Sequence, residues 1–333
     1  MPSFRTGTVT EVRLERPGLQ RVATDAGRAY VLTQLTGPVA VGDRVVLNTT
    51  AVELGLGTGG WHVVHWNLAR DAWSEPGPGH IMKIRYTSLQ SDTGAAEEAH
   101  PELSRDLEGM PVIACSLHSQ VPAVAVAIVA AVPTARIAYV MTDGAALPMA
   151  LSDLVVDMVE AGLLAATITA GHAFGGDLEA VSVPSALALA RHVVAADAAI
   201  VAMGPGVVGT GTELGTTSVE VAAVLDAAAA LGGAPIAALR MSSGDARARH
   251  QGVSHHTRTA LDLTRSRVLV AAPHEGAYVD TRHDVRLVSP PAIPELLRDA
   301  GLRVTTMGRS PAEDPLFFEA AGAAGALAAS LLR

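Results

Sequence analysis

The sequence contains very little cysteine, lysine or aromatic residue, and each scarcity excludes something. Cys115 is its only cysteine, so an intramolecular disulfide and a cysteine-based zinc site are both excluded. Lys83 is its only lysine, and a formal net charge of -9 without a long basic run argues against a nucleic-acid partner. Aromatic residues make up only 3%, so the core must be built from alanine, valine, leucine and isoleucine.

Long apolar runs are also missing. The longest, residues 121–132, is too short to cross a bilayer and is bracketed by Pro122 and Pro133. Residues 1–10 lack the charged and apolar regions of a signal peptide. We therefore expect a cytoplasmic protein without a membrane partner. A homodimer is the commonest assembly of such proteins and is the oligomeric state that we expect.

The first part of the chain has the pattern of a small barrel. Apolar and polar residues alternate in five short runs between residues 7 and 67, without an intervening helical period. This predicts an N-terminal β-barrel of the OB or SH3-like type in residues 1–73. Residues 74–79, SEPGPG, cannot form regular structure, so residues 74–106 are expected to connect two domains.

From residue 107 to 333, apolar runs alternate with alanine-rich helical stretches, which is typical of βαβ units. Small aliphatic residues suit parallel strands that are buried on both faces. We expect a mostly parallel, three-layer, Rossmann-like α/β domain. The expected strands are residues 111–116, 136–142, 164–170, 198–204, 235–241, 267–273 and 302–308. The expected helices are residues 123–131, 149–161, 185–196, 218–231, 254–263, 294–300 and 318–332.

In such a sheet, ligands bind beyond the carboxyl ends of the strands, and residues 203–217 leave one of these ends toward a helix. Glycine lets backbone amides approach an anion, and the helix N-terminus adds its dipole. We expect an anionic, phosphorylated ligand here, bound by Gly204, Gly206, Gly209, Thr210, Gly211 and Thr212. The dinucleotide fingerprint is incomplete because the helix starts too late, and Thr210 replaces the Walker lysine.

Residues 240–257, RMSSGDARARHQGVSHHT, form the densest polar cluster of the chain. Arg247, Arg249 and Arg240 are candidates to clamp phosphate or carboxylate oxygens through paired hydrogen bonds. Two histidines follow on a helix, where adjacent side chains point about 100° apart, so at most one is expected to face a ligand. We assign His255 a catalytic role. A solvated network of salt bridges is the alternative interpretation of this segment.

Residues 169–181 offer one imidazole and two carboxylates on a glycine-rich loop. His172, Asp177 and Glu179 are candidate catalytic groups and candidate ligands of Mg²⁺ or another divalent metal. No known ligand spacing such as H-E-x-x-H supports this assignment, which depends on residue type alone.

Several motifs together resemble one family. They are GHAFGGDLEAV, MGPGVVGTGTELG, RMSSGDARARHQGVSHHT and, in the barrel, TGGWHVVHWN. In these segments the chain resembles the bacterial family catalogued as domain of unknown function 3866. The resemblance covers nearly the whole chain and implies no particular reaction.

Three functions are compatible with these residues. The first is a hydrolase or transferase that acts on a phosphorylated or nucleotide-like small molecule, with a divalent metal as a candidate cofactor. The second is a sensor or regulatory protein that binds such a ligand without chemistry. The third is an NADP-dependent oxidoreductase with Arg240 near the 2′-phosphate, which the late helix start disfavours.

Overall fold

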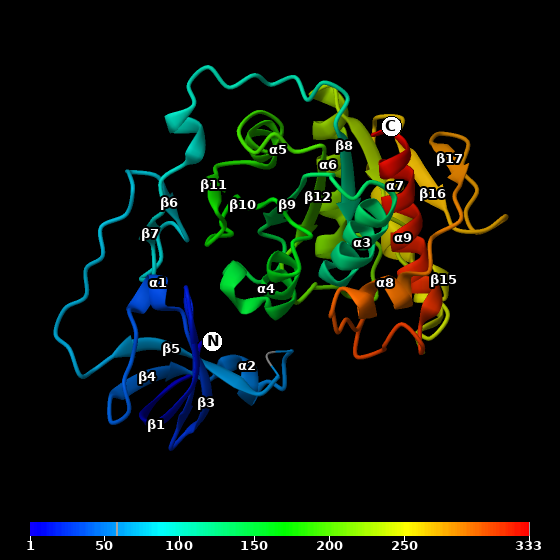
Figure 1. Cartoon of the computed structure of the whole chain (residues 1–333). Helices are drawn as coiled ribbons and strands as arrows, with labels where there is room; N and C mark the ends of the chain where they lie inside the picture. Colours follow the sequence, from blue (N-terminus) through cyan, green and yellow to red (C-terminus); the bar gives the residue numbers. More distant parts are fainter. Residues whose placement is uncertain (58, 333) are drawn as a thin grey trace. The chain divides into compact units, whose positions relative to one another are not determined.

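The computed structural model describes residues 1–57 and 59–332, which form two compact units. Unit 1 comprises Met1–Gly94, and unit 2 comprises Ala95–Arg333 (Figure 1). The division falls inside the segment 74–106 that we expected to connect the domains. Among the described residues, no helix combines the length and the apolar character that crossing a membrane requires.

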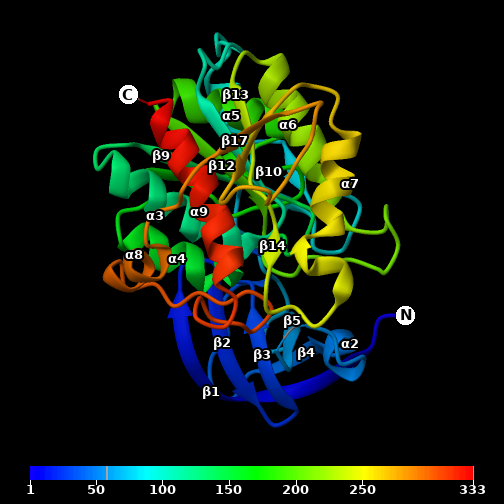
Figure 2. The same cartoon turned by 90° about the vertical axis from the view of Figure 1, so that its right-hand side faces the viewer.

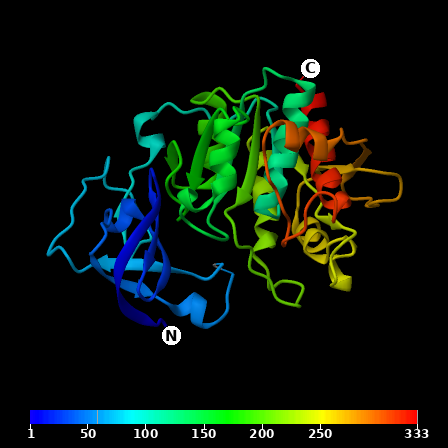
Figure 3. The same cartoon turned by 60° about the horizontal axis from the view of Figure 1, so that its bottom comes forward.

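Unit 1 contains the closed five-stranded barrel that the alternating pattern predicts (Figure 3). The strands are β1 (Phe4–Arg16), β2 (Leu19–Thr24), β3 (Gly27–Val31), β4 (Arg44–Asn48) and β5 (Trp61–Asn67). Strand β1 pairs with β2 and β4, and β3 runs parallel to β5. This is the strand order of an OB-type barrel, and a single helical turn, α1 (Thr33–Thr36), connects β3 to β4.

The barrel interior is small and aliphatic because one side of each strand points inward. Its core consists of Val9, Val22, Ala29, Val31, Val39, Val45, Leu47 and Val64. Unit 1 also contains the short helix α2 (Thr50–Glu53) and a two-stranded ribbon of β6 (Met82–Lys83) and β7 (Ser91–Asp92).

Unit 2 is built on an eight-stranded sheet in the order β11-β10-β9-β12-β8-β13-β16-β17, and every described pairing in it is parallel. The strands are β8 (Pro111–Cys115), β9 (Ile137–Thr142), β10 (Ala166–Ala170), β11 (Leu178–Ala180), β12 (Ala198–Met203), β13 (Ala234–Ala237), β16 (Leu269–Ala272) and β17 (Asp284–Leu287). The central strands β8, β9 and β12 are wholly buried, as is typical of parallel strands covered by helices.

Helices cover both faces of this sheet, which confirms the expected three layers (Figure 2). One face carries α3 (Val121–Ala131), α4 (Asp153–Glu160), α8 (Ile293–Asp299) and α9 (Pro315–Ser330). The other carries α5 (Val183–His192), α6 (Glu220–Ala230) and α7 (His255–Leu263). Alternation along β8 explains the layers, because Ile113 and Cys115 join the first core and Val112 and Ala114 join the second.

Helices α3 and α9 approach closely at a glycine. A Cβ atom on Gly325 would lie 2.4 Å from the carbonyl oxygen of Val124 and 2.8 Å from Cβ of Ala127. The alanine-rich sequence of α9 thus serves close packing on α3, and no larger residue than glycine fits at this point.

Two features of the sheet differ from the expectation. Residues 302–308 are not a strand, because Met307 and Gly308, both with positive φ, form a tight turn that closes the bridge between Thr306 and Arg309. The edge strands β11 and β17 were not expected. Both are short and partly exposed, so neither has the continuous apolar run that marks the inner strands.

Candidate functional site

The topology of unit 2 places a switch point at the carboxyl ends of β8 and β12. These strands are neighbours, but β8 leads into α3 on one face and β12 leads into α6 on the other. Loops that diverge in this way leave room between them, and ligands of open α/β sheets bind at such points.

A buried glutamine fixes the loop after β8. The side chain of Gln120 accepts hydrogen bonds from the backbone amides of Ser116 and Leu117 at 3.0 and 3.1 Å. Its amide group donates to the carbonyl oxygen of Leu239 at 3.1 Å, beyond the end of β13. One side chain therefore holds the ends of two neighbouring strands in a fixed relation.

A chain of hydrogen bonds runs through His118 beside this loop. The hydroxyl of Tyr139 donates to the carbonyl oxygen of Ala202 at 3.3 Å, so it accepts from Nδ1 of His118 at 3.0 Å. Nε2 of His118 then accepts from the hydroxyl of Ser152 at 2.7 Å. Burial lowers the pKa of His118 to about 4, which keeps the ring neutral. Ser152 also caps α4 by accepting from the amide of Val155.

Glu220, the first residue of α6, is a partly buried carboxyl group at the same edge. Its Oε1 accepts a 2.6 Å hydrogen bond from the hydroxyl of Thr142, at the end of β9. Burial raises the pKa of Glu220 to about 7, and the charge of Asp143 raises it further against the opposing effect of Thr142. A Cβ atom on Gly144 would lie 2.7 Å from Oε2, so this glycine leaves the space that the carboxyl group occupies.

The glycine and threonine loop does leave β12 and lead toward a helix, as expected. Gly204 is buried, and a Cβ atom at this position would lie 2.4 Å from the carbonyl oxygen of Ala146. Beyond it the loop projects as a hairpin-like excursion, in which Gly206, Gly209, Thr210, Gly211 and Thr212 are exposed. The helical segment begins only with η4 (Thr217–Val219), followed by α6. The sequence expectation of a late helix start is therefore confirmed.

The tip of this loop satisfies its own hydrogen bonds. The amide of Thr210 donates to the carbonyl of Gly215 at 2.7 Å, and the hydroxyls of Thr210 and Thr212 lie 2.7 Å apart. The amide of Thr212 donates to the hydroxyl of Thr210 at 3.1 Å. These groups are thus not arranged as a ring of open donors around an anion.

The base of the loop instead contacts histidine. Thr216 is buried, and its hydroxyl lies 3.4 Å from Nδ1 of His256. A Cβ atom on Gly209 would lie 2.9 Å from Cε1 of the same ring. The loop and the arginine-rich segment, predicted separately from sequence, are therefore packed together.

Within that segment, Arg247 is engaged by a buried carboxylate. Arg247 donates two hydrogen bonds to Asp245 at 2.9 and 2.8 Å, and Arg309 approaches the same carboxylate at 3.4 Å. Arg309 also pairs with Asp314, which is fully buried and accepts from Ser242 at 2.6 Å. Hydrogen bonds from Arg247 hold the pKa of Asp245 below its ordinary range. This network fixes the loop and leaves Arg247 little freedom to clamp a ligand.

Arg240 is in the opposite situation. Its side chain is buried, and within residues 1–57 and 59–332 it forms no ion pair. Nη1 donates instead to Nδ1 of His256 at 3.3 Å. Burial lowers the pKa of Arg240 to about 10, and the charge of Arg247 adds to this effect. Arg249 is exposed nearby, and its charge acts on His255 and His256.

Three histidines complete this group, which we call the Arg/His cluster: Arg240, Arg249, His250, His255 and His256. The rings of His255 and His256 lie 4.1 Å apart, and both belong to one group of candidate ligands with His250. Burial lowers the pKa of His250 to about 3 and that of His256 to about 4, and nearby positive charges contribute.

The structure does not bring His172, Asp177 and Glu179 together as a metal-binding group. Among the described residues, the group of three or more candidate ligands is the one formed by the histidines of the Arg/His cluster. Asp177 accepts from the backbone amide and the hydroxyl of Thr167, near the start of β10 and away from its carboxyl end. Glu179 lies on β11 rather than in a loop, and it accepts from Thr169 at 2.6 Å and from the amide of Gly175.

His172 follows β10 directly, and its backbone amide donates to Asp143 at 2.9 Å. Sequence reasoning missed Glu220 as a site residue, because it opens a helix and resembles an ordinary first-turn acid. Thr142 ends β9, so the carboxyl-end rule does identify it.

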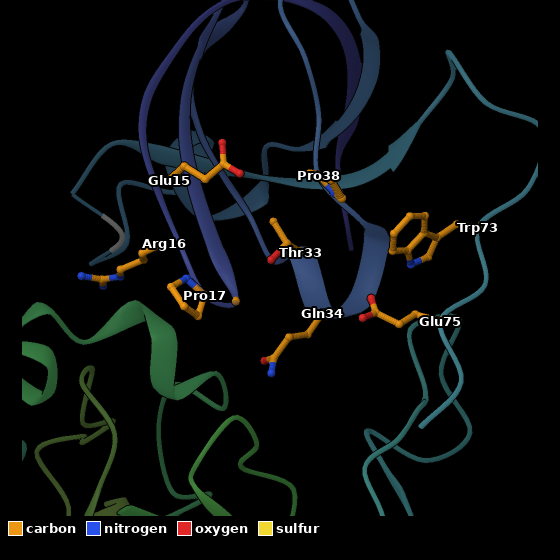
Figure 4. A pocket seen from close by; sticks show the side chains of 9 residues that line it. Glu15, Arg16, Pro17, Thr33, Gln34, Pro38, Trp73 and Glu75 are labelled. Atoms are coloured by element: carbon orange, nitrogen blue, oxygen red, sulfur yellow. The ribbon is translucent and has the colours of Figure 1, made fainter. Parts of the chain in front are cut away.

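Unit 1 has a separate hollow of about 550 Å³ (Figure 4). Pro17, Thr33, Gln34 and the ring of Trp73 line it, and both signs of charge are present through Glu15, Glu75 and Arg16. This mixed lining shows no preference for an anion.

Comparison with known proteins adds the family. A family model described as protein of unknown function (DUF3866) matches residues 28–325. The chain belongs to the DUF3866 family. The match extends from the barrel of unit 1 through most of α9, so both units are part of what defines DUF3866. Searches of the curated proteins and of the solved structures found no match.

Proposed function

We propose that the protein is an enzyme, a hydrolase or transferase, that acts on a phosphorylated or nucleotide-like small molecule bound at the Arg/His cluster. The observation that carries this proposal is the buried Arg240, which has no carboxylate partner in the part of the chain that the structure describes. A buried charge is costly unless it is paired. An anionic ligand supplies the missing partner, and Arg249 and the histidines add further donors.

The charge balance supports an anion at this place rather than elsewhere in unit 2. Asp245 and Asp314, the buried acids nearby, are committed to Arg247 and Arg309. The remaining cationic groups depress one another's pKa values, as shown by Arg240 and the histidines. A bound phosphate would reverse this mutual repulsion and would hold the guanidinium by paired hydrogen bonds.

Glu220 is the residue to which we assign proton transfer. A carboxyl group with a pKa near 7 can donate or accept a proton at neutral pH, and such shifted groups concentrate at active sites. In this proposal Arg240 and Arg249 hold the phosphate, the loop from Gly204 to Thr216 covers it, and Glu220 moves a proton.

A thermal-shift screen tests the proposal with nucleotides, sugar phosphates, NADP and inorganic phosphate. A ligand at 100 times its dissociation constant should stabilise the wild-type fold by about 2.7 kcal/mol. The shift should be absent in Arg240→Met and retained in Arg286→Ala, which removes an exposed arginine of β17. Retention of the full shift in Arg240→Met would refute the site.

A turnover assay distinguishes an enzyme from a sensor that only binds the ligand. Ligands found in the screen are incubated with wild type and with Glu220→Gln, and products are followed by phosphate release and mass spectrometry. Product formation that falls at least tenfold in Glu220→Gln supports the enzyme. Stabilisation without product, across metals and pH, would favour the sensor that only binds the ligand.

A further inference from the structure

The three histidines of the Arg/His cluster converge on one point. His250, at the end of η5 (Ala248–His250), and His255 and His256, at the start of α7, each offer one ring nitrogen, and these nitrogens lie within 4.8 Å of one another. The ring centroids are 5.1, 5.0 and 4.1 Å apart. Nitrogens bound at about 2 Å to one tetrahedral ion lie about 3.3 Å apart, so the rings would have to close slightly on an ion to bind it together.

Two ring nitrogens of these histidines lack a partner although they are buried. Nε2 of His255 and Nε2 of His256 make no hydrogen bond among the described residues. His256 is only 4% exposed. Buried polar atoms are almost always satisfied, so two orphaned nitrogens in one small group require an explanation.

Ser254 contacts two of the three histidines and fixes their positions. Its side chain, which is fully buried, lies 2.8 Å from Nδ1 of His250 and accepts from the amide of His256 at 3.3 Å. When Nδ1 of His250 donates to this hydroxyl, Nε2 is left as a free base. Metal-binding histidines typically have such a partner on the nitrogen that faces away from the ion.

We propose that His250, His255 and His256 bind a divalent ion of the zinc class. Imidazole nitrogen suits zinc, copper and nickel, whereas Mg²⁺ prefers oxygen ligands. Three protein ligands leave a fourth tetrahedral position open for water or for an oxygen of the substrate, which is the arrangement of catalytic rather than structural zinc. The ion thus differs in class and in position from the magnesium site that residues 169–181 suggested.

His256 couples this ion to Arg240. In the structure Arg240 donates to Nδ1 of His256, so the ring proton lies on Nε2. Binding a metal through Nε2 moves that proton to Nδ1, where the hydroxyl oxygen of Thr216 at 3.4 Å is the available acceptor. Arg240 then loses its ring partner and becomes available to an anion beside the metal.

The charges around the histidines explain why binding of a metal and binding of an anion should be coupled. Arg240, Arg247 and Arg249 act on the ring of His256, and Glu213 of the glycine and threonine loop acts on His255. Histidines bind a metal in their neutral form, and the arginines beside them repel a dication. An anion on the fourth position removes this repulsion. Metal binding itself stands without the proposed function; its enhancement by phosphate rests on that function.

The test uses the full chain, stripped with EDTA and dialysed. Zn²⁺ is titrated by calorimetry, and Co²⁺ is titrated by visible absorption, which is strong only in tetrahedral sites. We expect one ion per chain. Loss of a residue that only contacts a metal ligand lowers metal affinity by about 10–100-fold. Loss of a ligand itself should cost more, so His255→Ala and His256→Ala should each weaken binding by at least about 100-fold. Ser254→Ala should weaken it by about 10-fold.

His172→Ala is the matched control, because it removes another histidine of the same sheet edge. Circular dichroism in EDTA verifies that each variant folds, and the half-exposed His255 also allows the milder His255→Asn. Absence of Zn²⁺ heat and of Co²⁺ bands in wild type overturns the proposal. So does unchanged affinity in the cluster variants, or loss of binding in His172→Ala alone.

A second arm repeats the titration with inorganic phosphate. Tighter Zn²⁺ binding that disappears in Arg240→Met supports both the metal site and the anion site. If phosphate does not change the affinity for Zn²⁺, the result supports the metal site and contradicts the proposed function. Phosphate stabilisation through Arg240 in a chain that binds no metal supports the proposed function and overturns the metal site.

Discussion

Nη1 of Arg240 lies 3.3 Å from Nδ1 of His256, so a buried cation is held by a neutral ring rather than by a carboxylate. The contact joins the segment after β13 to the first turn of α7. It satisfies one donor of the guanidinium, which has no salt bridge among the described residues; the acid whose charge acts on it, Asp245, is already paired with Arg247 and Arg309. The free energy of unfolding should therefore respond unusually to replacement of this arginine.

Arg240→Met should leave the ligand-free protein as stable as wild type or stabilise it by about 1–3 kcal/mol, because it removes an uncompensated buried charge. Urea unfolding measures this. Arg309→Met is the comparison, since it strips a partner from the buried Asp245 and Asp314, and it should cost about 3 kcal/mol. Equal losses in the two variants would show that Arg240 is compensated after all.

Glu220→Gln should change how stability depends on pH. The pKa of Glu220 is raised from 4.5 to about 7, so the folded state binds more protons than the unfolded state between these values. Stability of wild type should thus fall as pH rises through this window, by up to about 3 kcal/mol from this group. Urea midpoints of Glu220→Gln should lack this decline relative to wild type. The exposed Glu160→Gln should keep it, and an identical profile for both variants would contradict the shift.

Ser152→Ala should cost more than an ordinary loss of a helix cap. Ser152 caps α4 and also donates to His118 at 2.7 Å, so the variant loses two interactions and should lose about 2 kcal/mol. Ser182→Ala removes the exposed cap of α5, which has no histidine partner, and should cost about 1 kcal/mol or less. Thermal and urea unfolding give both values. The same cost in both variants would mean that the bond to His118 contributes nothing.

Gly325→Ala should destabilise the protein although alanine is the better helix former. The added methyl group would meet the backbone of Val124 at 2.4 Å, and overpacking of this kind costs about 1–3 kcal/mol. Gly211→Ala is the control because no atom lies within 4 Å of the added Cβ, and it should be nearly neutral. A gain in stability in Gly325→Ala, measured by thermal unfolding, would show that α3 and α9 can separate without cost.

The architecture could be predicted from sequence because its signals are local. Alternation over residues 7–67 and the buried runs at β8, β9 and β12 each report burial on one or two faces. The edge strand β17 was not predicted because its partial exposure removes that signal. Residues 302–308 were wrongly predicted as a strand because the apolar run there forms a turn.

The site was harder to predict because pairing between distant residues decides which groups are free. The sequence does not show that Arg247 is occupied by Asp245 while Arg240 lacks an acid, since all three stand in one segment. It likewise does not show that Glu179 braces Thr169 instead of facing a ligand. Residue type pointed to segments that the structure packs against one another, and only the three-dimensional contacts separated paired groups from unpaired ones.

The position of β8 in the centre of the sheet also bears on how the chain folds. Val112 has Ala199 as its partner on one side and Pro235 on the other, and both belong to strands that come far later in the sequence. Such non-local pairing slows folding, because long loops must close before the contacts form. Until β12 and β13 arrive, the apolar edges of β8 stay unpaired and open to other chains. Refolding from denaturant should therefore be slow and should yield more aggregate as protein concentration rises.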